Sequence, residues 1–226
     1  MSLLALIPAR GGSKGIPRKN IRSFCGKPLL QWSIDVALAA SSVDRVVVST
    51  DDPEIADVAR AGGAEVPFLR PPELASDTAP GIAAVLHALQ QLPEVSAVLL
   101  LQPTSPLRRV EDVEAIVALQ HQAGPDAVVS VTPCNKHPAW MFGLSPAQVL
   151  EPLMILPDSG CRQHLPPVYV LNGALYLASR SFLEREHSFF TSNTVGYVMP
   201  LERSVDIDTQ LDWQWAEFLY STQSRM

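Results

Sequence analysis

Short apolar runs alternate with longer segments of helical periodicity along most of this 226-residue chain. The apolar runs are typical of strands buried in a sheet. We predict strands over residues 3–8, 45–50, 97–101 and 126–132. We predict the intervening helices over residues 53–61, 79–92 and 110–122. This order favours an α/β fold, in which βα units build a mainly parallel sheet with helices on both faces.

Two further helices are predicted from their apolar positions. Pro28 suits the first turn of a helix, and the apolar face of that helix comprises Leu29, Leu30, Ile34 and Leu38. The last helix follows Asp208, with a predicted apolar face of Leu211, Trp215, Phe218 and Leu219. We interpret Trp32, Trp213 and Trp215 as core residues on helix faces.

The region from Pro133 to Pro167 lacks both periodicities and holds seven of the twenty prolines. Strand character returns at residues 168–177. We therefore predict one domain over residues 1–226, from which residues 134–168 depart as an excursion from the sheet.

Composition and charge limit the classes of partner and location. Hydrophobic residues make up 47% of the chain and charged residues 18%, as in globular proteins. No apolar run approaches the roughly 20 residues of a membrane span, and the first residues lack the basic segment of a signal peptide. Cys25, Cys134 and Cys161 show no Cys-x-x-Cys spacing, so we predict no disulfide framework, no zinc site and a cytoplasmic location. The net charge of −6 disfavours nucleic acid as a partner.

A loop rich in glycine and cations follows the first predicted strand. Six of the seventeen Lys and Arg residues precede the first acidic residue, Asp35. Glycines let the backbone approach a ligand closely, while Arg10 and Lys19 add full charges. We predict a triphosphate site formed by Ala9, Arg10, Gly11, Gly12, Ser13 and Lys19. The loop has neither a Walker A nor a Rossmann glycine spacing, and its alternative interpretation is a solvated, flexible turn.

A pair of carboxylates, Asp206 and Asp208, precedes the last predicted helix. In an extended segment residues two apart point the same way, so both carboxylates face one side while Ile207 faces the core. Mg²⁺ takes one or two carboxylates and completes its shell with phosphate oxygens and water. We predict a metal site here. The alternative, which is compatible with metal binding, is that Asp208 or Thr209 caps the helix.

Two further segments end at the predicted carboxyl edge of the sheet, where α/β proteins bind ligands. In residues 101–108, we place Gln102 and Thr104 in a site for a hydroxyl-rich substrate, since Gln102 offers both a donor and an acceptor. The alternative is a proline-stiffened turn. In residues 69–78, we place Arg70, Ser76 and Asp77 with the nucleotide, whereas the alternative is that Ser76 or Asp77 caps the next helix.

Five segments, in order along nearly the whole chain, resemble the acylneuraminate cytidylyltransferase family, which makes CMP-sialic, CMP-legionaminic and CMP-pseudaminic acids. They are residues 10–15 with Lys19-Asn20, residues 69–71, residues 101–108, residues 172–176 and residues 206–208. The resemblance implies a Rossmann-like nucleotidyltransferase fold. It also implies transfer of CMP from CTP to the anomeric hydroxyl of a nine-carbon 2-keto-3-deoxy acidic sugar, with release of pyrophosphate.

The resemblance implies roles at matching positions. Arg10, Lys19 and Asp208 would be catalytic, Asn20 and Arg70 would contact the nucleoside, and Asp206 would join Asp208 in binding Mg²⁺ or Mn²⁺. The sugar site would comprise Gln102, Arg162, Asn172, Tyr176, Phe189 and Phe190. The excursion at residues 134–168 would be a lobe that joins two subunits into a homodimer.

Two positions depart from the sialic-acid enzymes, and both lie on the sugar side. Val170 stands where a basic residue is expected, and Trp140 follows His137-Pro138 where such enzymes carry a lysine nearby. We therefore expect Trp140 to pack against a less polar or bulkier acylated sugar, such as legionaminic acid. The alternatives are a cytidylyltransferase for the eight-carbon sugar Kdo and a non-catalytic nucleotide-binding subunit.

Overall fold

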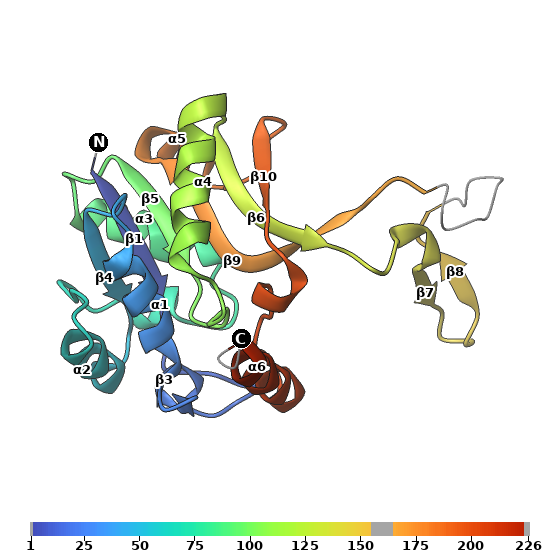
Figure 1. Ribbon diagram of the computed structural model, residues 1–226, viewed down its shortest axis with the longest axis horizontal. Helices are drawn as coiled ribbons and strands as arrows, with labels where there is room; N and C mark the ends of the chain where they lie inside the picture. Colours follow the sequence, from blue (N-terminus) through green and yellow to red (C-terminus); the bar gives the residue numbers. More distant parts are fainter. Residues whose placement is uncertain (1, 155–164, 224–226) are drawn as a thin grey trace.

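The computed structural model describes residues 2–154 and 165–223, and six of its strands form one sheet (Figure 1). They are β1 (Leu3–Pro8), β4 (Arg45–Ser49), β5 (Ala97–Leu101), β6 (Ala127–Pro133), β9 (Tyr169–Ser179) and β10 (Thr194–Val198). Their order is β10-β6-β9-β5-β1-β4. β9 pairs antiparallel with both of its neighbours, and the other pairs are parallel. The predicted mainly parallel sheet is confirmed.

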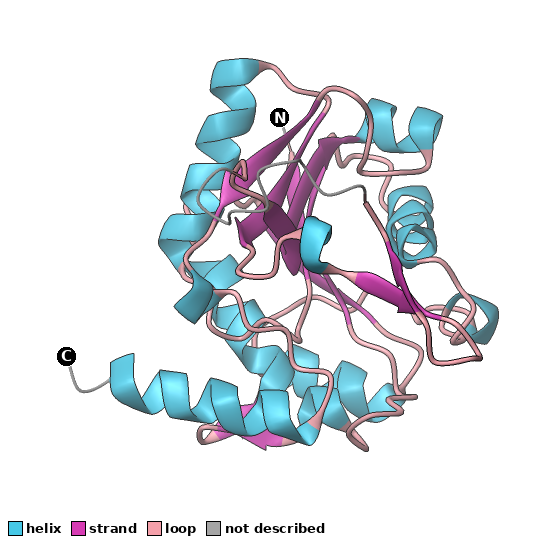
Figure 2. Ribbon diagram, turned by 90° about the vertical axis from the view of Figure 1, so that its right-hand side faces the viewer, coloured by secondary structure: helices cyan, strands magenta, loops and turns pink. Residues whose placement is uncertain are grey.

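Helices cover both faces of this sheet, as Figure 2 shows. One face carries α1 (Leu29–Ala39), α2 (Pro53–Ala61) and α4 (Val110–Ala123). The other carries α3 (Gly81–Gln91) and α5 (Arg180–Glu186). Side chains alternate along β1 between the two cores, with Leu4 and Leu6 on the α3 side and Ala5 on the α1 side. A strand buried on both faces reads as a continuous apolar run, which is why β1 was predictable.

Shorter elements connect these layers. They are the 3₁₀ helices η1 (Lys19–Ile21), η2 (Pro72–Leu74), η3 (Pro138–Trp140) and η5 (Leu201–Arg203), and the two-stranded ribbons β2 (Ser23–Phe24) with β3 (Lys27–Pro28) and β7 (Phe142–Leu144) with β8 (Leu150–Pro152). No helix among residues 2–154 and 165–223 combines the length and the apolar character that crossing a bilayer requires.

The last helix, α6 (Gln210–Gln223), buries a different face from the predicted one. Trp213 is 1% exposed, whereas Trp215 is 51% and Leu211 is 74% exposed. The prediction of a face through Leu211, Trp215 and Phe218 is therefore wrong. The reason is a third core, in which the Trp213 ring packs edge-on against Phe24 at 5.4 Å. This contact with the β2 residue decides which side of the helix faces inward.

The apolar face predicted for α1 needs a smaller correction. Leu29, Leu30 and Ile34 are buried, but Leu38 is 52% exposed. Ala37 takes the inward position one turn after Ile34.

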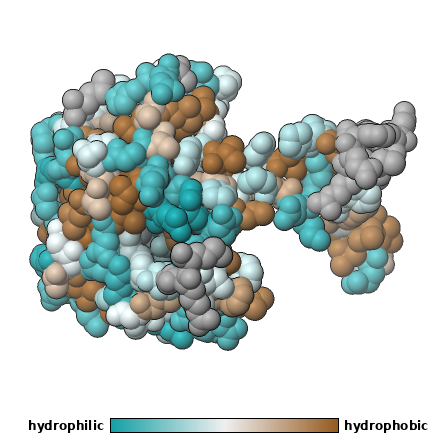
Figure 3. Space-filling view, viewed as in Figure 1, coloured by the Kyte–Doolittle hydropathy of each residue, from teal (hydrophilic) through white to brown (hydrophobic). Residues whose placement is uncertain are grey.

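Residues 134–154 leave the sheet at the end of β6 and form an arm, which Figure 1 shows projecting from the body of the molecule. The chain returns at β9, where Pro133 pairs with Tyr169. The β7–β8 ribbon lies within this arm. Apolar side chains gather over the arm in Figure 3, and its exposed large hydrophobic residues are Trp140, Met141, Phe142, Leu144, Val149, Leu150, Leu153 and Met154.

Replacing Trp213 by alanine should lower the free energy of unfolding by about 3–5 kcal/mol, because it empties the centre of the third core. Trp215→Ala is the matched control, since this neighbouring tryptophan is half exposed, and a cost of about 1 kcal/mol or less is expected. Urea unfolding followed by circular dichroism measures both values. Equal losses from the two substitutions would contradict this orientation of α6.

Candidate functional site

A cleft of about 360 Å³ lies at the carboxyl edge of the sheet, where β1 and β5 end. Four segments distant in the sequence line it: the loop after β1, the segment from Arg70 to Gly81, the turn after β5, and Asp208 before α6. The predicted site residues that line the cleft are Arg10, Ser13, Lys19, Asn20, Arg70, Ser76, Asp77, Gln102, Thr104 and Asp208. The structure thus brings together most residues predicted for the nucleotide.

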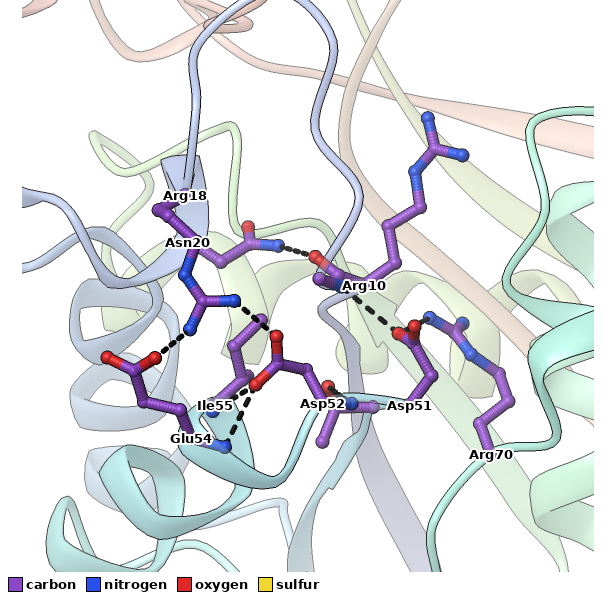
Figure 4. A network of polar contacts seen from close by, with 10 residues as sticks. Arg10, Arg18, Asn20, Asp51, Asp52, Glu54, Ile55 and Arg70 are labelled. Carbon is purple, nitrogen blue, oxygen red and sulfur yellow. Dashed lines mark hydrogen bonds and ion pairs between the residues drawn. The ribbon is translucent and has the colours of Figure 1, made fainter.

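The loop after β1 is fastened at several points, as Figure 4 shows. The Gly11 amide donates to Asp51 Oδ1 at 3.1 Å, and Asn20 Nδ2 donates to the Arg10 carbonyl at 3.0 Å. Arg18 pairs with Asp52 and Glu54 at the start of α2. This set of contacts favours a positioned loop over the alternative of a flexible, solvated turn.

Three small residues predicted for the triphosphate site, Ala9, Gly11 and Gly12, are not among the residues that line the cleft. The Ala9 amide donates to the Ser49 carbonyl at 2.9 Å, which fixes the exit from β1. A Cβ on Gly11 would lie 2.6 Å from Asp52 Oδ2, whereas a Cβ on Gly12 would meet nothing within 4 Å. A side chain at position 11 would therefore displace the Asp52 side chain, whereas position 12 has room for one.

Gly15 lets the loop touch the segment before α6. A Cβ at this position would lie 2.2 Å from the Asp208 carbonyl oxygen. Because that neighbour is backbone, any side chain at position 15 must push the loop away from Asp208. Gly15 thus sets the distance between the cationic loop and the carboxylate segment.

Lys19 joins the same two segments through its ammonium group. Its Nζ donates to the Ile207 carbonyl at 2.6 Å and lies 3.1 Å from Asp208 Oδ1. The residue is 9% exposed, so the charge is held at the cleft wall. A buried ammonium between a carbonyl and a carboxylate is compensated, and it remains positioned to face an incoming anion.

Arg70 places a second buried cation in the cleft. The residue is 6% exposed, and its Nη2 lies 3.9 Å from Asp51 Oδ1. Its Nε has no hydrogen-bond partner within the described part of the chain. Burial lowers the pKa of the Arg70 guanidinium, the nearby Asp51 charge opposes this shift, and Arg10 adds to it. A buried guanidinium with an unpaired donor is suited to bind a polar ligand group.

Asp77 pairs with two cations at the mouth of the cleft. Its Oδ1 accepts from Arg10 Nη1 at 2.7 Å, and its Oδ2 lies 2.6 Å from Lys14 Nζ. Hydrogen bonds from Lys14 and then Arg10 hold the pKa of the Asp77 carboxyl below its usual value. The N-cap of α3 is Pro80 and has no side-chain cap, so the alternative of a helix cap at Ser76 or Asp77 is wrong.

The segment around Asp206 and Asp208 alternates as predicted. Ile207 is fully buried and its amide donates to the Thr104 carbonyl at 2.8 Å, while both aspartates are exposed. Although Asp206 keeps exposed surface, desolvation of its carboxyl group raises its pKa, a hydrogen bond from Thr104 opposes the shift, and the charge of Asp208 adds to it. Two carboxylates this close favour a cation between or beside them.

The helix-cap role predicted as an alternative for this segment falls to Thr209. Its Oγ1 accepts from the Asp212 amide at 3.3 Å, and the Thr209 amide donates to Asp212 Oδ2 at 2.7 Å. The Asp208 carboxylate is therefore left to Lys19 and the cleft.

The residues present fit a divalent ion of the magnesium type. No group of three or more His, Cys, Asp or Glu side chains suited to a metal occurs in the residues that the structure describes. Two oxygen donors from Asp206 and Asp208 are nevertheless what Mg²⁺ takes when phosphates and water complete its shell.

The turn after β5 is fixed from inside the protein by Arg108. This residue is 2% exposed, and its guanidinium donates to the Gln102 carbonyl and to Ser33 Oγ. Burial lowers the pKa of Arg108 to about 9. The Gln102 backbone is thereby fixed, while its side chain lines the cleft beside Thr104, whose Oγ1 lies 3.5 Å from Gln102 Oε1.

Aromatic side chains lie beyond Asp206, outside the residues that line the cleft. The Tyr176 ring is 5.5 Å from Phe189 and 6.3 Å from Phe190. Phe189 is 6% exposed and packs in the core, whereas Phe190 is 48% exposed. Burial raises the pKa of Tyr176, and the charge of Asp206 adds to this shift, so the two side chains are neighbours.

Asn172 is buried, and its amide group is fully occupied inside the protein. Its Oδ1 accepts from Ser130 Oγ and the Ala174 amide, and its Nδ2 donates to Ser204 Oγ and contacts Met199 sulfur. These bonds position the start of the strand beside the cleft and leave no donor or acceptor for a ligand in this state. Arg162, the remaining predicted sugar residue, lies outside the described residues.

Sequence reasoning missed the start of α3 as part of the cleft. Pro80, Gly81 and Ala84 line it together with Leu74 and Ala75. A Pro-Gly pair before a helical pattern marks an uncapped helix start, whose free amides attract anions. That signal was present in the sequence.

Comparisons with known proteins show the family of this chain. A family model described as cytidylyltransferase matches residues 4–138. The CMP-N,N'-diacetyllegionaminic acid synthase of Legionella pneumophila is 38% identical over 224 residues, covering 97% of this chain and 96% of that protein. The N-acylneuraminate cytidylyltransferase of Escherichia coli is 33% identical across 99% of this chain, which spans only 53% of that longer protein.

A solved structure gives the same fold. The CTP complex of CMP:2-keto-3-deoxy-manno-octonic acid synthetase aligns with a TM-score of 0.77 at 18% identity, covering 99% of this chain and all of that one. At that identity the likeness concerns the fold alone.

Replacing Gly15 by alanine should weaken the binding of inorganic pyrophosphate by about tenfold or more, because the loop that carries the cations must move away from Asp208. Gly12→Ala is the control, since a Cβ there meets nothing. Isothermal titration calorimetry measures both affinities. An unchanged affinity in Gly15→Ala would show that this contact does not position the loop.

Proposed function

This chain belongs to the cytidylyltransferase family, and from that premise we propose that it transfers CMP from CTP to the anomeric hydroxyl of a nine-carbon 2-keto-3-deoxy acidic sugar, releasing pyrophosphate. The observation that carries this proposal is the meeting of Lys19, Arg70 and Asp208 in one cleft. Membership of an enzyme family sets aside the alternative of a non-catalytic nucleotide-binding subunit.

The nucleotide would occupy the cleft between the loop after β1 and the start of α3. Arg10 and Lys19 would neutralise the triphosphate, together with the amides of the glycine loop. Arg70 and Asn20 would contact the nucleoside. Phosphoryl transfer requires positioning and charge neutralisation more than a covalent nucleophile, and fixed cations at a cleft wall supply both.

Asp206 and Asp208 would hold Mg²⁺, or Mn²⁺, against the phosphates. When bound, this ion polarises the α-phosphate. Lys19 contributes separately, because its ammonium group is fixed by the Ile207 carbonyl and does not depend on the ion for its position. The ammonium group and the ion would thus act side by side on the phosphate chain, since Lys19 Nζ lies 3.1 Å from Asp208 Oδ1.

The acidic sugar would lie on the Gln102 side of the cleft. Gln102 and Thr104 offer hydrogen bonds to its hydroxyl groups, and the exposed ring of Phe190 beside Tyr176 offers an apolar wall for an acyl group. In-line transfer requires the anomeric hydroxyl opposite the departing pyrophosphate, so the sugar and the cationic loop must lie on opposite sides of the α-phosphate.

We further propose a legionaminic-type sugar as the preferred substrate. Trp140 and Val170 are exposed and apolar where basic residues are expected for sialic acid. A relative at 38% identity is named for diacetyllegionaminic acid, and it matches over nearly its full length. Kdo remains the alternative sugar, supported by a likeness in fold.

We propose that the arm joins two copies of the chain. Its exposed apolar side chains, from Trp140 to Met154, form a surface of the kind that is buried between subunits. The homodimer and the cytoplasmic location predicted from the sequence remain predictions. Of the three cysteines, Cys25 and Cys134 are free thiols, and Cys161 lies outside the described residues.

Pyrophosphate release from CTP with a panel of acidic sugars tests the activity and the substrate together. We expect the highest kcat/KM with N,N'-diacetyllegionaminic acid, a lower value with N-acetylneuraminic acid, and the lowest with Kdo. A preference for N-acetylneuraminic acid would contradict the legionaminic assignment, and a preference for Kdo would contradict the nine-carbon class. No release with any sugar would contradict the proposed function.

Asp208→Asn should lower Mg²⁺-dependent turnover by about 100-fold or more, because one of two charged metal ligands is lost. Turnover is measured against Mg²⁺ concentration, and the variant should need more Mg²⁺ for half of its maximal rate. Glu202→Gln, an exposed carboxylate on η5, is the control. Full activity with an unchanged Mg²⁺ dependence in Asp208→Asn would remove the metal assignment.

A further inference from the structure

The carboxylate of Asp77 occupies both of its oxygens with cations from the glycine loop. Arg10 Nη1 lies 2.7 Å from one oxygen and Lys14 Nζ lies 2.6 Å from the other. Arg10 is one of the two cations proposed to hold the triphosphate. The Asp77 carboxylate is therefore the anion that pairs with these cations where the phosphates are expected to bind.

These ion pairs are the kind that a ligand can replace. The Asp77 side chain is 43% exposed, and the side chains of Arg10 and Lys14 are 37% and 78% exposed. Exposed pairs contribute little to stability, since water and salt screen them. By contrast, Lys19 is buried and donates to a backbone carbonyl, so its ammonium group does not depend on an exposed carboxylate for its position.

The pairs also connect two segments that are independent in the fold. Asp77 lies between η2 and α3, and Arg10 lies 67 residues earlier, after β1. Both residues line the cleft. Asp77 does not cap α3, because the N-cap is Pro80 without a side-chain cap. Its role in the described structure is therefore to pair with Arg10 and Lys14.

We propose that Asp77 is a displaceable counter-ion, which holds Arg10 and Lys14 before the nucleotide binds, yields them to the triphosphate, and takes them back as pyrophosphate leaves. This inference rests on the proposed function, and it replaces the direct nucleotide contact predicted for Asp77. A carboxylate with one charge competes poorly with a triphosphate, and competes better with ligands that carry fewer charges. Asp77 would thus favour CTP over less charged nucleotides and assist the release of pyrophosphate.

Competition leaves a signature that a direct contact does not. Any ligand whose phosphates take Arg10 and Lys14 must first break both pairs with Asp77. Removing the carboxylate charge therefore strengthens the binding of CTP, pyrophosphate and inorganic tripolyphosphate. Cytidine has no phosphate and needs no displacement, so its affinity stays the same.

The test is calorimetric binding of these four ligands to the wild type and to Asp77→Asn, at low salt and without sugar. We expect the three phosphate ligands to bind about threefold to tenfold more tightly to the variant, the size expected for two exposed pairs, with cytidine unchanged. Glu73→Gln is the matched control. Glu73 lies in the same segment, and its carboxylate forms no ion pair within the described residues. It should change none of the affinities by more than about twofold.

Three results would overturn the proposal. Weaker binding of CTP and cytidine to Asp77→Asn would make Asp77 a direct ligand of the nucleoside. Unchanged binding of all phosphates would show that the pairs do not compete. An equal gain in Glu73→Gln would reduce the effect to general charge. Tripolyphosphate has no base, so its affinity tests the role of Asp77 independently of CTP recognition. If the wild type failed to use CTP, that result would contradict only the proposed function.

Discussion

The ammonium group of Lys19 connects the loop after β1 with the segment before α6. It donates to the Ile207 carbonyl, 188 residues later in the sequence, and lies beside the Asp208 carboxylate. Gly15 permits this contact by bringing the loop against the Asp208 backbone. Both segments are anchored in the third core, where Ile16 of the loop and Ile207 of the carboxylate segment are buried in one cluster with Trp213. Cations and carboxylates therefore keep a fixed spacing before any ligand arrives.

The fold and the nucleotide side of the site were predictable because each rests on local sequence. β1 and β5 are continuous apolar runs, and the cationic loop follows β1 directly. Asp206 and Asp208 alternate with a buried Ile207 as any extended segment does. Parallel strands end at one edge, so these segments had to meet there.

The remaining features depend on contacts that no local pattern contains. α6 has apolar residues on two sides, and its packing in the third core, including the Phe24 ring, decides that Trp213 faces inward. Asn172 matches the expected sugar residue in sequence, yet its side-chain amide contacts Ser130, Met199 and Ser204 from distant parts of the chain, as well as the Ala174 amide of its own strand. Asp77 was predicted as a nucleotide contact, and no local pattern indicated its ion pairs with Arg10 and Lys14. The sugar side is therefore less determined by sequence than the phosphate side.

The pairing of Pro133 with Tyr169 closes the arm at its base. The described residues between these two, 134–154 and 165–168, lie outside the six-stranded sheet, and the β6–β9 ladder begins again at this pair. Loop-closure entropy rises only slowly with length, so insertions and deletions in the arm cost the fold little. Descendants of one ancestral protein could thus exchange arms, and with them the apolar surface that the arm exposes, while inheriting an unaltered cleft.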